Sequence, residues 1–303
     1  MKQKLYLIDG MYIAFKSYYA MAQSNLINKN NEPIGAIFGF VSTITSLLEK
    51  LEPQNIAVCF DSKEKTFRHK LYSEYKANRV AFPEELRVQL PYIKDFLDLI
   101  GVNRIELPGY EADDIIGTYC KNGAANNWEV YCWTTDKDFY QLLENNVNII
   151  RPSKVQNDFE IINVNDVKGI FGVAADEVVD YLALIGDNAD NVPGVKGIGE
   201  KTAIPLIEKY KTIENIYANI ENIDNPRLKK LLETGKENAY LSKKLVTIDR
   251  DVPIETNYDC LERRKVDYIE LDNLFSKLGL RQHREKWKSL QIKDIKKNSD
   301  SLF

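Results

Sequence analysis

Nine acidic residues lie at or near the ends of short apolar runs, and this arrangement constrains the fold more than any other feature of the sequence. They are Asp9, Asp61, Glu111, Asp113, Asp114, Asp136, Asp138, Asp187 and Asp190. Four apolar runs end at such an acid: residues 4–8 at Asp9, 56–60 at Asp61, 130–135 at Asp136 and 181–186 at Asp187. Short β-branched and aromatic runs are typical of buried strands, and ligands of α/β sheets gather at the carboxyl ends of strands. The sequence therefore predicts an α/β fold with a mostly parallel central sheet and an acidic edge.

The acidic edge predicts a site for more than one metal ion. Carboxylates held close together repel one another strongly unless cations lie among them. The chain has only two histidines, and its four cysteines form no C-x-x-C pair, which excludes a zinc site. Oxygen ligands without sulfur or imidazole favour hard ions such as Mg²⁺ or Mn²⁺.

The composition is typical of a globular protein that works in a reducing cytoplasm. Hydrophobic residues make up 44% of the chain and charged residues 28%. The apolar start reaches Asp9 too early for a secretory signal, and no apolar run approaches the length of a membrane span. The net charge is -4, but with the nine acids set aside the basic residues outnumber the acidic ones. Nucleic acid therefore remains an acceptable partner.

The pattern along the chain predicts two domains and a tail. Residues 1–175 alternate strand-like and helix-like stretches, as expected for a parallel sheet with crossover helices. Residues 176–290 favour a smaller helical domain, with helices expected at residues 203–210, 226–234, 238–246 and 266–278. Residues 291–303 form a polar tail that we expect to be disordered.

Two acidic motifs are predicted to lie at helix starts. Residues 109–116 resemble a first helical turn, in which Glu111 and Asp114 share a face with Asp113 beside them. Acids there also suit the helix dipole, so ordinary N-terminal charge bias and metal binding both explain the motif. Residues 134–139 read as a strand end that turns into a helix, where a capping aspartate alone would explain Asp136.

A glycine-spaced loop follows Asp187 and Asp190 and opens a helix. Its glycines let backbone N–H groups approach a phosphate, and its lysines supply cationic contacts. We therefore predict DNA contacts by Gly194, Lys196, Gly197, Gly199 and Lys201. Pro205 removes one backbone donor from the helix, so we expect a short kink or a late helix start. A plain turn would explain Asp187 and Asp190 taken alone.

A basic, aromatic stretch follows Asp61. Within it, Lys76 and Arg79 would share one helical face at i, i+3. A solvated charged face is the simpler interpretation of the stretch taken alone. Its place directly after an expected metal ligand instead favours a clamp for phosphate, with His69 at the surface.

Six motifs, in this order, resemble the 5′-nuclease (flap endonuclease) family. They are Leu7–Gly10, Phe60–Lys63, Tyr75–Arg79, Gly109–Asp114, Thr135–Asp138 and Gly186–Ala203. The resemblance covers residues 4–290 and is closest to the N-terminal 5′→3′ exonuclease domain of bacterial DNA polymerase I. It implies a PIN-like α/β nuclease domain with a basic helical arch around residues 65–90. It also implies a helical DNA-binding domain with a helix–three-turn–helix at residues 186–210.

The resemblance implies a role for each candidate residue. The first metal would be held by Asp9, Asp61, Glu111 and Asp113, and the second by Asp136, Asp138, Asp187 and Asp190, with Asp114 among or directly behind these ligands. Lys76 and Arg79 would act in catalysis. DNA contacts would come from Phe15, Arg68, Tyr75, Gly194, Lys196, Gly197, Gly199 and Lys201, although a core position would also explain Phe15.

The implied reaction is structure-specific hydrolysis of DNA phosphodiesters by a 5′→3′ exonuclease and flap endonuclease. Two Mg²⁺ or Mn²⁺ ions would serve as cofactors, with a K⁺ ion at the helix–three-turn–helix. The implied substrates are 5′ flaps, nicked or branched duplexes and RNA-primed ends, met during replication and repair at the bacterial nucleoid. The enzyme would be a monomer that works with a DNA polymerase in cis or in trans.

Other classes of protein remain as alternatives. A non-catalytic structure-specific DNA-binding protein would keep the scaffold but lose metal ligands, and a PIN-like ribonuclease would share the acidic edge without the glycine loop. A nucleotide-binding α/β protein is disfavoured, because no G-x-G-x-x-G follows the first strand and no P-loop occurs.

Overall fold

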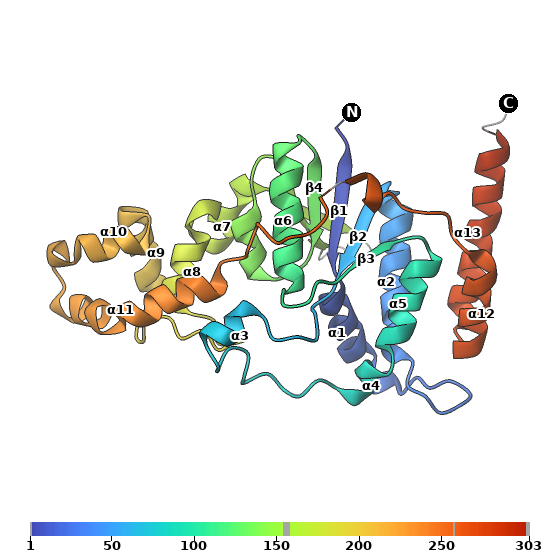
Figure 1. The fold of residues 1–303 in the computed structure, drawn as a ribbon, viewed down its shortest axis with the longest axis horizontal. Coiled ribbons are helices and arrows are strands. Elements are labelled where there is room, and N and C mark those ends of the chain that lie inside the picture. The colour runs from blue at the N-terminus through green and yellow to red at the C-terminus, as the bar shows by residue number, and fades with distance from the viewer. Residues whose placement is uncertain (1, 154–157, 257, 301–303) are drawn as a thin grey trace. The chain divides into compact units, whose positions relative to one another are not determined.

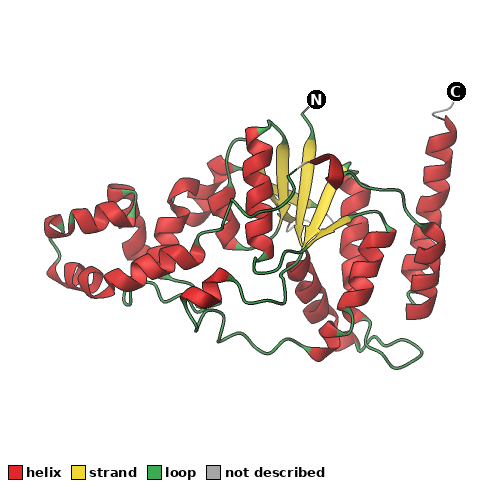
Figure 2. Cartoon of the chain, in the orientation of Figure 1, coloured by secondary structure: helices red, strands yellow, loops and turns green. Residues whose placement is uncertain are grey.

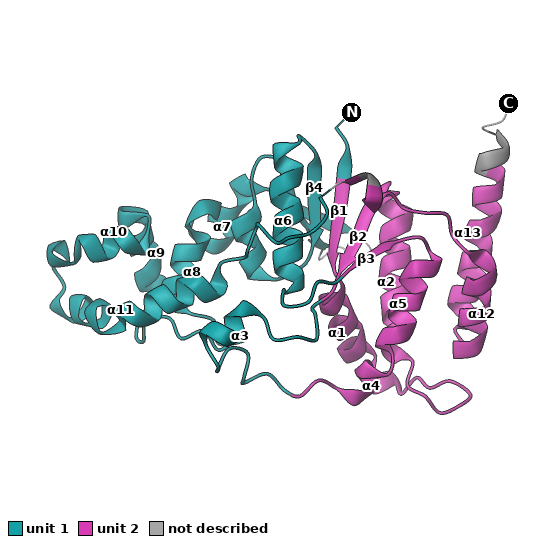
Figure 3. Cartoon of the chain, viewed as in Figure 1, with its two compact units in different colours: residues 1–4, 61–80, 106–256 teal, residues 5–60, 81–105, 257–303 magenta. Residues whose placement is uncertain are grey.

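The fold is that of a computed structural model, which describes residues 2–153, 158–256 and 258–300. The chain divides into two compact units, shown in Figure 3. The first unit comprises residues 1–4, 61–80 and 106–256, and the second comprises residues 5–60, 81–105 and 257–303. None of the helices formed by the described residues combines the length and the apolar character that crossing a membrane requires.

The described residues form six strands, most of which run parallel to their neighbours (Figures 1 and 2). In the second unit, β1 (Lys4–Asp9) pairs in parallel with β2 (Asn55–Cys59), and β2 pairs in parallel with β3 (Asn103–Ile105). In the first unit, β4 (Glu129–Trp133) pairs in parallel with β5 (Val147–Pro152), and β5 pairs antiparallel with β6 (Phe159–Ile162). The predicted α/β fold with mostly parallel strands and flanking helices is confirmed.

The helices of each unit account for most of the remaining residues. The second unit contains α1 (Gly10–Met21), α2 (Gly35–Leu51), α4 (Glu84–Arg87), α5 (Leu90–Leu99), α12 (Tyr268–Leu278) and α13 (Arg281–Asp300). The first unit contains α3 (Phe67–Leu71), α6 (Ala112–Ala125), α7 (Val167–Phe171), α8 (Val178–Ile185), α9 (Glu200–Tyr210), α10 (Ile213–Ala218) and α11 (Pro226–Val246). Short 3-10 helices lie at η1 (Ala22–Ser24), η2 (Lys137–Leu142), η3 (Val164–Asp166), η4 (Ala175–Glu177), η5 (Ile220–Asn222) and η6 (Tyr258–Leu261).

Apolar spacing explains the core of the second unit. Helix α2 carries Ile37, Phe40, Ile44 and Leu47 at intervals of three and four residues, and all four are almost completely buried. Every residue of β2 is buried as well, as expected for a strand that is covered on both faces. Hydrophobic burial on this scale fixes the strand ends from which the acidic residues project.

The run before Asp187 forms a helix, so the prediction of a strand at residues 181–186 is wrong. Helix α8 (Val178–Ile185) covers most of this run and buries Tyr181, Leu182 and Leu184. A short apolar run fits a buried helix as well as a buried strand, and periodicity alone does not separate them. Asp187 therefore follows a helix, while Asp9 ends a strand and Asp61 and Asp136 come shortly after strands.

Two further helix predictions differ from the structure. The segments predicted as separate helices at residues 226–234 and 238–246 form the single helix α11. Gly235, at the expected break, instead gives space to Val195, since a Cβ atom at Gly235 would lie 2.6 Å from Val195 Cγ1. The predicted disordered tail is also wrong for residues 291–300, because α13 continues to Asp300; residues 301–303 lie outside the described part of the chain.

The predicted basic helical arch is helical only in part. Between residues 65 and 90 the helical residues belong to the short helices α3 and α4 and to the first residue of α5. Residues 73–78 form consecutive turns instead. Pro205 lies inside α9, which begins at Glu200, so the expected late helix start is not seen.

Candidate active site

Local backbone geometry places most of the candidate acids of the first unit. Glu111 is the N-cap residue of α6, and Asp113 and Asp114 lie in the first turn of that helix. Asp136 is the N-cap of η2, where its side chain accepts the N–H of Asp138 at 2.9 Å. The predicted helix starts at both motifs are confirmed, because a capping carboxylate satisfies backbone N–H groups that the first helical turn leaves unpaired.

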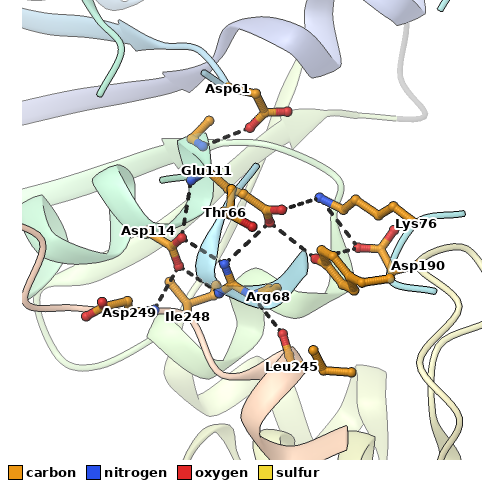
Figure 4. Close-up of polar contacts among 12 residues, drawn as sticks. Asp61, Thr66, Arg68, Lys76, Glu111, Asp114, Asp190, Leu245, Ile248 and Asp249 are labelled. Carbon is orange, nitrogen blue, oxygen red and sulfur yellow. Dashed lines mark hydrogen bonds and ion pairs between the residues drawn. The ribbon is translucent and has the colours of Figure 1, made fainter. Parts of the chain in front are cut away.

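One part of the acidic cluster surrounds the start of α6 (Figure 4). Asp61 Oδ1 accepts the N–H of Ala112 at 2.9 Å, which ties the segment that follows β2 to this helix end. The Asp114 side chain accepts the N–H of Glu111, and Glu111 is only 5% exposed. Together these contacts hold Asp61 and Glu111 at the N-terminal end of α6.

The other part consists of Asp136, Asp138, Asp187 and Asp190. Loss of hydration, followed by the negative charges of Asp190 and Asp187, raises the pKa of Asp136. Loss of hydration and the charge of Asp136 raise the pKa of Asp138 well above its usual range. Asp138 Oδ1 is buried and accepts no hydrogen bond from the described residues. Asp136 and Asp138 therefore lie where their negative charge is unfavourable, whereas Asp187 lies 3.3 Å from Lys137 Nζ and Asp190 pairs with the cations described next.

Lys76 joins the two parts of the cluster. Its Nζ lies 3.0 Å from Glu111 Oε1 and 3.8 Å from Asp190 Oδ2 (Figure 4). Arg79 forms an ion pair with Asp190 Oδ1. The Tyr75 hydroxyl lies 3.2 Å from Glu111 Oε2 and 3.3 Å from Asp190 Oδ2. Lys76 and the Tyr75 hydroxyl thus contact carboxylates of both parts, and Arg79 contacts one.

The shared helical face predicted for Lys76 and Arg79 is wrong. Lys76 has a φ of 56°, in the left-handed region, and the chain turns there rather than forming a helix. An i, i+3 spacing does not distinguish a helix from such a turn. The two side chains nevertheless reach the same carboxylate, Asp190.

Arg68 is not placed to contact DNA, and that assignment is corrected. It is only 2% exposed, and it donates bidentate hydrogen bonds of 2.8 and 2.7 Å to Asp114. Its remaining donors reach the carbonyl oxygen of Leu245 at 2.8 Å, with Glu111 3.5 Å away (Figure 4), and the carbonyl oxygen of Thr247, also at 2.8 Å. A buried arginine with every donor occupied has none left for a phosphate.

Asp114 and Tyr75 are also buried and contact other residues of the site. Asp114 is fully buried, and both of its oxygens accept from Arg68, with further hydrogen bonds from the N–H groups of Glu111 and Asp249. It is therefore corrected from a metal ligand to a residue that holds Glu111. Tyr75 is 5% exposed, which leaves it no face for DNA. His69, expected at the surface, is half-buried and caps α3 through Thr66.

The glycine loop divides into a buried start and an exposed end. Gly194 is buried and donates its N–H to Ser242 Oγ at 2.9 Å, so its assignment as a DNA contact is corrected. Lys196, Gly197, Gly199 and Lys201 are exposed around the start of α9, which confirms the predicted loop that opens a helix. Their contact with DNA stays a prediction.

Replacing Gly186 by alanine is expected to destabilise the protein. Gly186 has a φ of 72°, and an added Cβ would lie 2.5 Å from the carbonyl oxygen of Val192. The left-handed backbone alone costs a residue other than glycine about 1–2 kcal/mol, and the clash adds to this. Thermal unfolding should show a melting temperature several degrees lower. Gly199→Ala is the matched control, because a Cβ there meets nothing within 4 Å; equal melting temperatures for the two variants would contradict the prediction.

Asp9 and Phe15 lie in the second unit. Asp9 is the N-cap of α1, where its side chain accepts the N–H of Tyr12 at 2.9 Å. Phe15 is half-buried and packs edge-on against Phe82, with ring centroids 5.1 Å apart, and stacks on Tyr19. These contacts fit the core interpretation of Phe15, and its contact with DNA stays a prediction.

The residues present fit divalent cations by their chemistry. The donors are all carboxylate oxygens, and the raised pKa values of Asp136 and Asp138 show a need for positive charge. Among the described residues, no group of three potential ligands is already drawn together around one point. Lys76 and Arg79 contact Glu111 and Asp190 instead.

Sequence reasoning gave no role to Asn78 and Asn191, which the structure places beside these cations. Asn78 Nδ2 donates to the carbonyl oxygen of Asn188, and Asn191 Nδ2 donates to that of Glu74. Their position inside two of the motifs was the only sequence signal for such a role. Asparagine is common in turns, where its side chain usually bonds to the turn's own backbone, so the residue type alone did not indicate a contact between turns.

Solved structures with a similar fold include a 5′-exonuclease and a catalytic core bound to DNA. The fold is similar to that of the phage T5 5′-exonuclease with bound zinc, at a TM-score of 0.64 and 22% identity, covering 91% of this chain and 98% of that one. It is also similar to the catalytic core of Rad2 in complex with a DNA substrate, at a TM-score of 0.61 and 15% identity, covering 91% and 88%. At these identities the likeness establishes the fold.

Relatives in sequence are closer. A protein of Aquifex aeolicus named 5′-3′ exonuclease is 37% identical over 301 residues, which covers 99% of this chain and 96% of that protein. DNA polymerase I of Caldicellulosiruptor bescii is 38% identical over 288 residues, or 91% of this chain. The chain spans only 34% of the length of that polymerase.

Two family descriptions together cover most of the chain. Residues 4–172 match the N-terminal resolvase-like domain of 5′-3′ exonucleases, and residues 173–269 match their C-terminal SAM fold. The predicted domain boundary near residue 175 stays a prediction. With the resemblance seen in the six motifs thereby confirmed, the chain belongs to the 5′-3′ exonuclease family.

Proposed function

We propose that the protein hydrolyses DNA phosphodiester bonds from 5′ ends and at 5′ flaps, with two divalent metal ions. The observation that carries this proposal is the position of Lys76 Nζ, 3.0 Å from Glu111 and 3.8 Å from Asp190. A cation held between two groups of carboxylates suits a reaction in which a phosphate must approach an acidic site. Family membership supports the same chemistry.

Divalent ions, when bound, supply a hydroxide near neutral pH and stabilise the leaving oxygen. Asp61, Glu111 and Asp113 would hold one ion, and Asp136, Asp138, Asp187 and Asp190 the other. The assignment of Asp9 to the first ion rests on the resemblance alone. Lys76 and Arg79 would neutralise negative charge that builds on the non-bridging phosphate oxygens, as preorganised electrostatic stabilisation.

The finer assignments extend this proposal. We take Mg²⁺ or Mn²⁺ as the working ions, since the donors are all oxygens, and K⁺ as an ion bound by the glycine loop. The proposed substrates are 5′ flaps, nicked or branched duplexes and RNA-primed ends in the bacterial cytoplasm at the nucleoid. The protein would act as a monomer with a DNA polymerase as partner, in keeping with the names of its relatives.

Incubation with a labelled 5′-flap oligonucleotide, with and without Mg²⁺, tests the proposal. Release of the flap only when Mg²⁺ is present supports it. A protein that binds the flap without cleaving it in either Mg²⁺ or Mn²⁺ would be a non-catalytic DNA-binding protein. Cleavage of single-stranded RNA in preference to the flap would indicate a PIN-like ribonuclease.

Replacing Lys196 and Lys201 together by alanine is expected to weaken DNA binding and to flatten its dependence on salt. Each lysine that neutralises a phosphate releases counterions, so losing two should reduce the slope of log K against log salt by about two. Fluorescence anisotropy titrations over a series of salt concentrations measure this slope. Lys230→Ala, an exposed lysine on α11, serves as a single-charge comparison; an unchanged slope in the double variant would remove the glycine loop from the interface.

A further inference from the structure

Two turns of the first unit are joined beside the acidic cluster. One comprises residues 74–79 and carries Lys76 and Arg79; the other comprises residues 187–192 and carries Asp187 and Asp190. At the centre of the junction, the N–H of Lys76 donates to the carbonyl oxygen of Asp190 at 2.9 Å. Among the described residues, it is the only backbone–backbone hydrogen bond between the two turns.

Two asparagine side chains extend the junction on either side of that bond. Asn191 Nδ2 donates to the carbonyl oxygen of Glu74 at 2.7 Å, and Asn78 Nδ2 donates to the carbonyl oxygen of Asn188 at 2.5 Å. The paired residues are 74 with 191, 76 with 190 and 78 with 188. Along the first turn the residue numbers rise while their partners' numbers fall, as in a pair of antiparallel strands. Side-chain amides therefore supply the outer two hydrogen bonds of a short ladder.

Backbone geometry explains why the side chains are needed. Lys76 and Asn191 both have φ values of 56°, in the left-handed region, so neither turn is extended as a strand would be. The backbone N–H groups of such turns cannot form the regular series of hydrogen bonds that joins two strands. The amides of Asn78 and Asn191 bridge the distance that the twisted backbones leave.

The junction bears on the cations because it fixes the backbone from which they project. Lys76 Nζ contacts Glu111 and Asp190, and Arg79 contacts Asp190, from a turn whose side chains are largely exposed. We propose that Asn78 and Asn191 are positioning residues, which clamp the turn of residues 74–79 so that Lys76 and Arg79 stay over the acidic cluster when DNA arrives. This inference rests on the proposed nuclease function and adds two residues to its machinery.

The test compares Asn78→Ala and Asn191→Gly with the wild-type protein. Glycine is chosen at residue 191 because it removes the amide and still adopts the left-handed backbone without strain. Single-turnover cleavage of a 5′-flap substrate should slow about tenfold in each variant, since a small misplacement of catalytic groups is costly. The Kd measured by anisotropy without divalent ions should stay within about twofold. Asn145→Ala, an exposed loop asparagine outside both turns, should match the wild type in both measurements.

Two further measurements separate positioning from a general structural role. In a protein that already carries Lys76→Ala and Arg79→Ala, Asn78→Ala should cause no further loss of rate, because the groups it positions are gone. Hydrogen exchange of the Lys76 amide should accelerate in Asn78→Ala and Asn191→Gly, whether or not the protein cleaves DNA.

The possible results decide the inference. An equal loss of rate in the wild-type and the Lys76→Ala/Arg79→Ala backgrounds overturns it, as does a weakening of Kd that accounts for the whole loss. Unchanged rates and unchanged Lys76 exchange also overturn it. If the wild-type protein fails to cleave the flap, the proposed function fails, and Lys76 exchange still decides whether the clamp exists.

Discussion

Asp136→Asn is expected to slow cleavage of a 5′ flap by about three orders of magnitude, which corresponds to about 4 kcal/mol of activation free energy. The amide would remove one of the negative charges that we propose to hold a divalent ion. In the wild-type protein Asp136 accepts the N–H of Asp138 at 2.9 Å. The side-chain oxygen of asparagine can accept the same hydrogen bond, so the start of η2 should be preserved. Single-turnover cleavage with saturating enzyme measures the effect.

The same variant should become more stable when no divalent ion is present. The pKa of Asp136 is raised in the folded protein, by loss of hydration and then by Asp190 and Asp187. A raised carboxyl pKa means that the ionised form is less favourable in the folded than in the unfolded state, so at neutral pH the charge destabilises the fold. Removing that charge should raise the melting temperature measured in a chelator.

DNA binding should survive or improve in Asp136→Asn, because one negative charge fewer faces the phosphates. The exposed Asp224→Asn, which removes a charge elsewhere in the first unit, provides the control for net charge. Near-normal cleavage by Asp136→Asn would show that Asp136 is not a metal ligand. A lower melting temperature in chelator would show that its charge is compensated by neighbours.

Features set by neighbouring residues in the chain could be predicted from the sequence. The helix starts at Glu111 and Asp136 were predicted because a capping carboxylate and the N–H groups it accepts lie within three residues of each other. The loop before α9 could be predicted because its closely spaced glycines directly precede the first residues of the helix. The buried strands β1 and β2 follow from short, dense apolar runs, which can be recognised without knowing the partner strands.

Features set by distant contacts could not be predicted. Arg68 reads as an exposed base in a basic stretch, but its partner Asp114 lies 46 residues away, and the carbonyl of Leu245 lies 177 residues away. The left-handed turn at Lys76 depends on the carbonyl of Asp190, which the local sequence does not reveal. Tertiary contacts of this kind override the local pattern, and they explain why three predicted DNA contacts, Arg68, Tyr75 and Gly194, prove to be buried.

Arg68→Ala is expected to cost about 3–5 kcal/mol of the free energy of unfolding, because it leaves the fully buried Asp114 carboxylate without its counter-ion. That is a large part of the about 5–15 kcal/mol that stabilises a typical domain. Denaturant unfolding followed by circular dichroism measures the loss. If Arg68→Ala does not fold, Arg68→Lys, which keeps the charge but loses the bidentate geometry, should fold with an intermediate stability.

The second unit offers a matched control in Arg104. It makes the same bidentate hydrogen bonds, to Asp98, but the two side chains are 32% and 44% exposed. Water replaces a lost partner there, so Arg104→Ala should cost no more than about 1 kcal/mol. Similar losses for the two variants would show that burial does not decide the importance of Arg68. A large difference would mean that the arginine of the basic stretch stabilises the start of α6, and through it Glu111, rather than binding DNA.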